Sequence, residues 1–131
     1  MSFKESCKWI DSRQEDLLNN LMRLSEINSG TSNLEGIRTV ADYFRSYFSG
    51  TADSISEIQS QSREHTDISG NKIKEEFGNL LSFKKRTEAP IQVLLAGHMD
   101  TVFPLSHSFQ TPKKLDENTL LGPGVADMKG G

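Results

Sequence analysis

The sequence predicts an α/β protein, and three observations support this fold class. Amphipathic helical patterns occupy residues 6–28 and 34–48. An apolar run at 91–96, broken only by Gln92, is typical of a strand buried on both faces. Helices followed by strands at this spacing favour a layered arrangement. We therefore expect helices packed on part of a mixed sheet.

The first helix is expected over residues 6–28. Its apolar side chains recur at three-, four- and seven-residue spacing, with charged and amide side chains between them. Asn28 and Ser29 end this pattern, and Gly30 is expected to supply the positive φ of a C-cap region. The members of the apolar stripe are Trp9, Ile10, Leu17, Leu18, Leu21, Met22 and Leu24.

A second helix is expected to begin after Asn33, which offers an N-cap together with the two residues before it. Glu35 in the first turn suits the helix dipole, whereas Gly36 weakens the start slightly. Gly50 ends the pattern. We expect the aromatic members of its apolar stripe to lie in the core. The stripe consists of Leu34, Ile37, Val40, Ala41, Phe44, Tyr47 and Phe48.

The middle of the chain is more polar. A weak edge strand is predicted around Ile55 and Ile58, and a second strand at 80–83 after a turn at Gly78. Residues 60–70 are rich in Ser, Gln, Asp and Thr, which indicates a loop carrying a solvated His65. Further on, the pattern at 113–121 indicates a hairpin that turns at 116–118.

Composition restricts the class of protein. The 131 residues suit one domain, and a net charge of −3 gives no electrostatic footprint for nucleic acid. A single cysteine, Cys7, excludes an internal disulfide and favours a reducing compartment. The charged N-terminus lacks the apolar centre of a signal peptide, and no run approaches a membrane span. We therefore expect a cytoplasmic protein.

Two short segments carry the candidate chemistry. In the first, His98 and Asp100 are two residues apart, so in an extended chain they point to the same face. A carboxylate beside an imidazole fixes the tautomer of a metal-binding histidine, but a solvated pair at a strand end fits the same residues. In the second, at 122–131, a glycine-dense stretch would hold its single acid, Asp127, rigidly.

GHMDTV followed by GPGVADMKGG resembles the motifs of the zinc-dependent aminoacylase, carboxypeptidase G and acetylornithine deacetylase family of metallohydrolases. The sequence HMDTVFP in the first motif and the GPG at the beginning of the second are most similar to the glutamate carboxypeptidase branch. This resemblance implies that His98 is a ligand to one zinc and that Asp127 bridges two zincs. It implies a catalytic-site role for Asp100, which clamps His98, and a cis peptide bond at Asp127–Met128.

The activity that the resemblance implies is metal-assisted hydrolysis of an amide bond. The substrate would be a small N-acyl amino acid or a peptide with a C-terminal glutamate-type residue. The zinc pair would lower the pKa of a water, and a glutamate would act as general base. Cobalt or manganese would suit the same nitrogen and oxygen ligands.

Several parts of the family pattern have no counterpart in the chain. The pattern calls for a downstream Glu-Glu pair, a further acidic ligand, a distant histidine and a lid domain, and Glu75-Glu76 lies in a polar stretch before the motifs. We therefore interpret residues 1–131 as a single partial catalytic domain, a truncated N-terminal portion without peptidase activity of its own.

A truncated sheet leaves an unpaired edge, which predicts a homodimer or larger self-association. The alternative is a non-catalytic α/β module, a relic or a partner-binding domain with no complete metal site.

Overall fold

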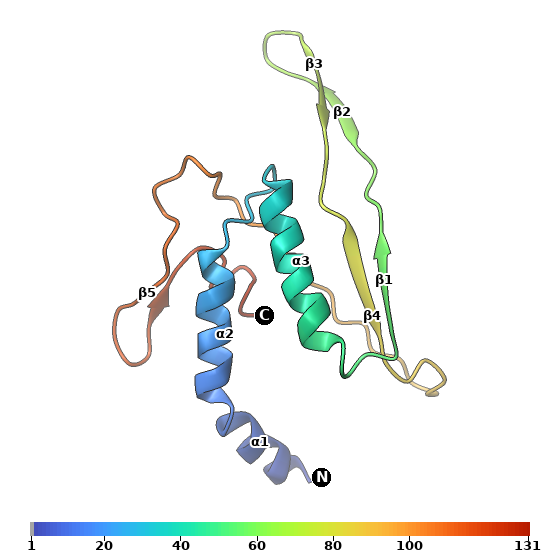
Figure 1. Cartoon of the computed structure of the whole chain (residues 1–131), viewed down its shortest axis with the longest axis vertical. Coiled ribbons are helices and arrows are strands. Elements are labelled where there is room, and N and C mark those ends of the chain that lie inside the picture. Colours follow the sequence, from blue (N-terminus) through green and yellow to red (C-terminus); the bar gives the residue numbers. More distant parts are fainter. Residues whose placement is uncertain (1) are drawn as a thin grey trace.

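The computed structural model describes residues 2–131, and within them it has three helices and three separate two-stranded antiparallel sheets (Figure 1). The protein is a small α/β fold, as predicted. The strands nevertheless form these three small sheets where we expected part of one mixed sheet. No helix among residues 2–131 is long and apolar enough to cross a membrane.

The first predicted helix is divided into α1 (Phe3–Asp11) and α2 (Gln14–Glu26). At the break, the Arg13 amide donates to the Ile10 carbonyl, three residues back, and the Ser12 hydroxyl donates to the Trp9 carbonyl. α1 begins with a capping box between Ser2 and Glu5 but buries none of its residues. The apolar stripe is therefore buried only near the end of α2, at Leu24.

Helix α3 (Leu34–Phe48) begins where the sequence predicts it. The side chain of Asn33 accepts a hydrogen bond from the Gly36 amide at 3.2 Å. Gly36 is required here, because a Cβ at this position would lie 1.7 Å from the Asn28 carbonyl oxygen. The expectation that the aromatic residues are core is only partly correct, since Tyr47 remains 49% exposed.

Strands β1 (Ser54–Ile58) and β4 (Leu80–Lys84) pair in antiparallel register, and both were predicted. Helix α3 lies against this sheet. The rings of Phe48 and Phe83 are 5.0 Å apart, and Arg45 pairs with Glu57 at 2.6 Å.

Strands β2 (Arg63–Thr66) and β3 (Lys72–Glu75) form a hairpin that extends away from the helices (Figure 1). The prediction of a loop over 60–70 is therefore wrong at β2. A polar strand lacks the apolar alternation by which strands are recognised, and this one is held by pairing with β3, where His65 faces Ile73. Glu75, in the polar stretch before the motifs, is the last residue of β3.

The apolar run at 91–96 is not a strand, and the prediction that it is buried on both faces is wrong. Val93, Leu94 and Leu95 are 78%, 89% and 90% exposed. Among the described residues, no backbone group at 91–98 forms a backbone hydrogen bond. An extended segment becomes a strand only through a partner, and this part of the chain meets none.

Strands β5 (Lys113–Lys114) and β6 (Leu120–Leu121) form the hairpin predicted at 113–121. This hairpin leads into the glycine-rich segment. The small core lies between α2 and α3 and contains Leu24, Ile37, Val40 and Ala41. Four buried polar residues, Ser25, Ser29, Thr101 and Lys129, mark the place where the two motifs meet the end of α2.

Candidate metal centre

The first motif is fixed to the turn that follows α2. Thr101 donates its amide to the Ser29 carbonyl at 2.8 Å, and its carbonyl accepts from the Thr31 amide at 3.1 Å. Between them, Gly30 and Thr101 form an isolated parallel bridge. Gly30 does not have the positive φ that we expected. It is needed for close approach instead, because a Cβ there would lie 2.5 Å from the Phe103 carbonyl oxygen.

Buried polar side chains join the same end of α2 to both motifs. Ser29 donates its hydroxyl to the Met99 carbonyl at 2.8 Å, and Ser25 donates to the Pro123 carbonyl at 2.6 Å. The Lys129 ammonium donates to the carbonyls of Leu24 and Ile27 at 2.9 and 2.7 Å. Burial lowers the pKa of Lys129 to about 8.

The second motif is a compact turn that presents Asp127. Gly124 has a φ of +74°, which glycine adopts without strain, and its carbonyl accepts from the Lys129 amide at 2.7 Å. The peptide bond Asp127–Met128 is cis, as the sequence resemblance implies.

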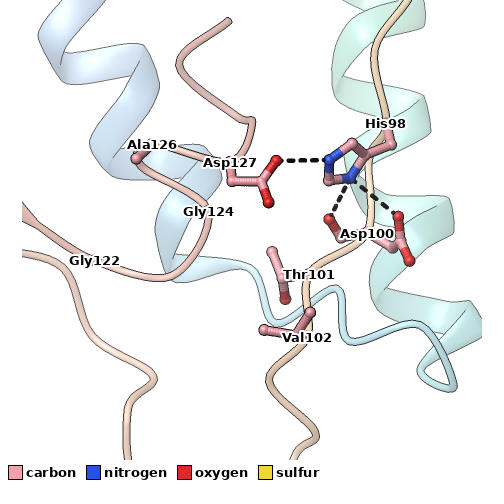
Figure 2. Close-up of a pocket in the computed structure, with 8 residues that line it drawn as sticks. All are labelled: His98, Asp100, Thr101, Val102, Gly122, Gly124, Ala126 and Asp127. Carbon is pink, nitrogen blue, oxygen red and sulfur yellow. Dashed lines mark hydrogen bonds and ion pairs between the residues drawn. The ribbon is translucent and has the colours of Figure 1, made fainter.

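His98 lies between two carboxylates, as Figure 2 shows. Its Nε2 is 2.9 Å from Oδ1 of Asp127. Its Nδ1 is 3.0 Å from the Asp100 backbone carbonyl oxygen and 3.2 Å from Oδ1 of the same residue. The predicted juxtaposition of His98 and Asp100 is thus present. The hydrogen bond to Asp127 raises the pKa of His98, and the backbone carbonyl of Asp100 contributes in the same direction against a lowering by burial.

These side chains border an open cavity of about 180 Å³ (Figure 2). Both ligand candidates are accessible, since the side chains of His98 and Asp127 are 46% and 84% exposed. The cavity is lined by His98, Asp100, Thr101, Val102, Gly122, Gly124, Ala126 and Asp127.

The donor atoms fit two positions of a metal site. Two ligands of one tetrahedral zinc lie about 3.3 Å apart. The separation of 2.9 Å between His98 Nε2 and Asp127 Oδ1 needs only a small widening to reach that distance. Residues 2–131 hold no group of three or more His, Cys, Asp or Glu side chains that could bind a metal ion. The described residues thus bring together two candidate donor atoms, whereas a catalytic zinc site usually has three protein ligands.

The other two histidines do not line this cavity. His65 belongs to the β2–β3 hairpin, and the Nδ1 of His107 accepts from the Phe109 amide at 3.0 Å. Sequence reasoning did not select the buried Ser25, Ser29 and Lys129 or the hydroxyl of Thr31. Only the position of Lys129, two residues after Asp127, was a signal that could have found one of them.

Comparison with known proteins supports a distant relationship to a peptidase. The chain is similar to Carboxypeptidase G2 of Pseudomonas sp. (strain RS-16), with 27% identity over 118 residues. The match covers 90% of this chain and 26% of the relative, so the chain spans about a quarter of the length of the protein that it matches. No protein-family model and no solved structure matches the chain.

Proposed function

We propose that the chain forms the N-terminal part of a metal-dependent exopeptidase or amidohydrolase. In this proposal His98 and Asp127 bind the metal, and Asp100 orients His98. The observation that carries the proposal is the placement of one imidazole between two carboxylates, one of which lies 29 residues away on a glycine-rich turn. The distant similarity to a carboxypeptidase supports the same class of enzyme.

Each of the three side chains has a task that its position supports. Asp100 engages Nδ1 of His98, which favours Nε2 as the metal-binding nitrogen. Asp127 turns one oxygen toward that nitrogen, and its large exposure leaves the second oxygen accessible for a bridging role. One nitrogen and two carboxylate oxygens are donors that suit zinc, cobalt or manganese.

Bound zinc would supply Lewis-acid polarisation of an amide carbonyl and of a water. The chain's own residues hold and orient the metal ligands, and the open cavity leaves room for substrate beside them. Because no glutamate lines this cavity, the general base is expected from outside it. The substrate that we propose is an N-acyl amino acid or a peptide with a C-terminal glutamate-type residue.

The test is the zinc content of the purified chain after equilibration and dialysis. We expect zinc binding that falls at least tenfold in His98→Ala, because one of two donors is lost. The matched control is His65→Ala, which removes an exposed histidine from the β2–β3 hairpin and should leave zinc binding unchanged. Equal zinc content in the two variants would contradict the proposal.

A second candidate is a non-catalytic α/β module that keeps the motifs without a complete metal site. The observation in its favour is the lack of a three-ligand cluster within residues 2–131. Zinc stoichiometry separates the two proposals. No zinc uptake by the wild-type chain would favour the module, whereas nearly two zincs per chain would indicate that further ligands come from a partner.

A further inference from the structure

Thr31 reaches the first motif from a distant part of the sequence. Its Oγ1 lies 2.6 Å from Oδ2 of Asp100, a residue 69 positions away. The other acceptor near this hydroxyl, the Thr101 carbonyl, is 3.4 Å away. A hydroxyl has one proton to donate, and the shorter contact to a charged acceptor is the stronger hydrogen bond. The proton of Thr31 therefore goes to Asp100.

Asp100 uses its two oxygens for different partners. Oδ2 accepts from Thr31, and Oδ1 lies 3.2 Å from Nδ1 of His98. The backbone carbonyl of Asp100 also faces this nitrogen, at 3.0 Å. The side chain of Asp100 is 34% exposed, so packing alone does not fix its rotamer. Since the carboxylate is planar, a hydrogen bond that holds Oδ2 also determines where Oδ1 lies. The hydroxyl of Thr31 thus holds one of the two Asp100 oxygens that face Nδ1 of His98, and the backbone carbonyl is the other.

The backbone keeps Thr31 in register with Asp100. The Thr31 amide donates to the Thr101 carbonyl, and the Thr101 amide donates to Ser29. Gly30 permits this approach, because a Cβ at its position would meet the Phe103 carbonyl oxygen at 2.5 Å. These backbone hydrogen bonds to Thr101 keep residue 31 beside the segment that carries Asp100.

We propose that Thr31 is a positioning residue for the metal-binding side chain of His98, and that it acts through Asp100. The metal part of this inference rests on the proposed function. The hydrogen-bonded series Thr31–Asp100–His98 does not, because its geometry is present without a metal. The two parts can therefore be tested separately.

The test compares three variants. Thr31→Val removes the hydroxyl and nearly keeps the shape, whereas Thr31→Ser keeps the hydroxyl. The matched control is Thr39→Val, which removes a hydroxyl that donates to the Glu35 carbonyl on α3. Should Thr31→Val fail to fold, Thr31→Ala set against Thr31→Ser gives the same comparison.

The first readout is the imidazole Nδ1 proton of His98 in the metal-free chain, observed by NMR and assigned from its absence in His98→Ala. We expect its exchange with water to be about tenfold faster in Thr31→Val, the scale of one lost hydrogen bond. Exchange in Thr31→Ser and Thr39→Val should remain at the wild-type rate. A merely structural role of Thr31 would not produce this pattern.

The second readout is zinc affinity by titration, which we expect to fall about tenfold in Thr31→Val and to recover in Thr31→Ser. Faster proton exchange without zinc binding in any variant would support the positioning role and overturn only the proposed function. Wild-type proton exchange in Thr31→Val would overturn the positioning role, whatever the zinc affinity.

Discussion

Lys129 places a charged group in the interior, where it joins the glycine-rich turn to the end of α2. Only 6% of the residue is exposed, and its ammonium donates to the carbonyls of Leu24 and Ile27. These carbonyls belong to the C-terminal end of α2, where helical carbonyls lack partners and where positive charge is favourable. The turn that carries Asp127 is thus held by a side chain rather than by a strand.

We predict that Lys129→Met destabilises the folded chain by about 1–3 kcal/mol, because it leaves buried carbonyls without their donor while nearly preserving volume. Urea unfolding followed by circular dichroism measures the change. Lys72→Met, at an exposed position of β3, is the control and should have little effect. Equal midpoints for the two variants would show that Lys129 does not hold the turn.

Among individual residues, the sequence predicted contacts between side chains that are close along the chain. His98 and Asp100 lie two residues apart, so their common face follows from local geometry. The partners of Ser25 and Thr31 lie 98 and 69 residues away, and no local pattern indicates which hydroxyl will meet which loop. The proximity of Asp127 to His98 followed only from the motif resemblance.

Among the elements, the β2–β3 hairpin depends on the turn that Asp67 organises. Its carboxylate accepts from the amides of Ser69 and Asn71, each at 2.8 Å, and from the Asn71 side chain at 3.0 Å. These hydrogen bonds, those from Asn71 first, lower the pKa of Asp67 below its ordinary value.

A lowered pKa in the folded state means that Asp67 stabilises the hairpin above its unfolded pKa of 3.8 and that this contribution is lost as the pH falls through the folded value. We predict that the protection factors of the β2 and β3 amides, which compare their exchange with that of an unfolded chain at the same pH, fall in that acidic range. Asp67→Asn isolates this carboxylate from the nearby Arg63–Glu75 and Lys74–Glu76 ion pairs. An unchanged acid response in Asp67→Asn would assign the effect to those pairs.

The start of α3 was predicted correctly where two strand assignments were wrong, for a physical reason. Asn33 caps α3 through a local contact with Gly36, which the sequence displays directly. Strand formation requires a partner elsewhere in the chain. The polar β2 has such a partner in β3, and the apolar run at 91–96 has none within the described residues. Hydrophobicity alone therefore predicted a strand at 91–96, where there is none, and a loop at β2, where there is a strand.

For the molecule as a whole, the apolar run at 91–96 is the largest departure from the predicted architecture. Ile91, Val93, Leu94 and Leu95 are all at least 78% exposed, and backbone groups of the run are open for pairing. Such a segment is a template for association with another strand. A second copy of the chain presents the same segment, which can pair with it in antiparallel register.

We predict that the isolated chain forms dimers or larger assemblies through this segment. Light scattering over a range of concentrations measures the assembly, and Leu94→Lys should shift it toward the monomer. Ile68→Lys, at the fully exposed tip of the β2–β3 hairpin, is the matched control and should not. A wild-type chain that stays monomeric at high concentration would exclude this interface.

The measurement that tests the metal-site assignment most directly is anomalous diffraction at the zinc edge from crystals of the chain grown with zinc. We predict a zinc ion within about 2.0–2.2 Å of both Nε2 of His98 and a carboxylate oxygen of Asp127. Zinc bound at His65 or His107 instead, with none between His98 and Asp127, would contradict it.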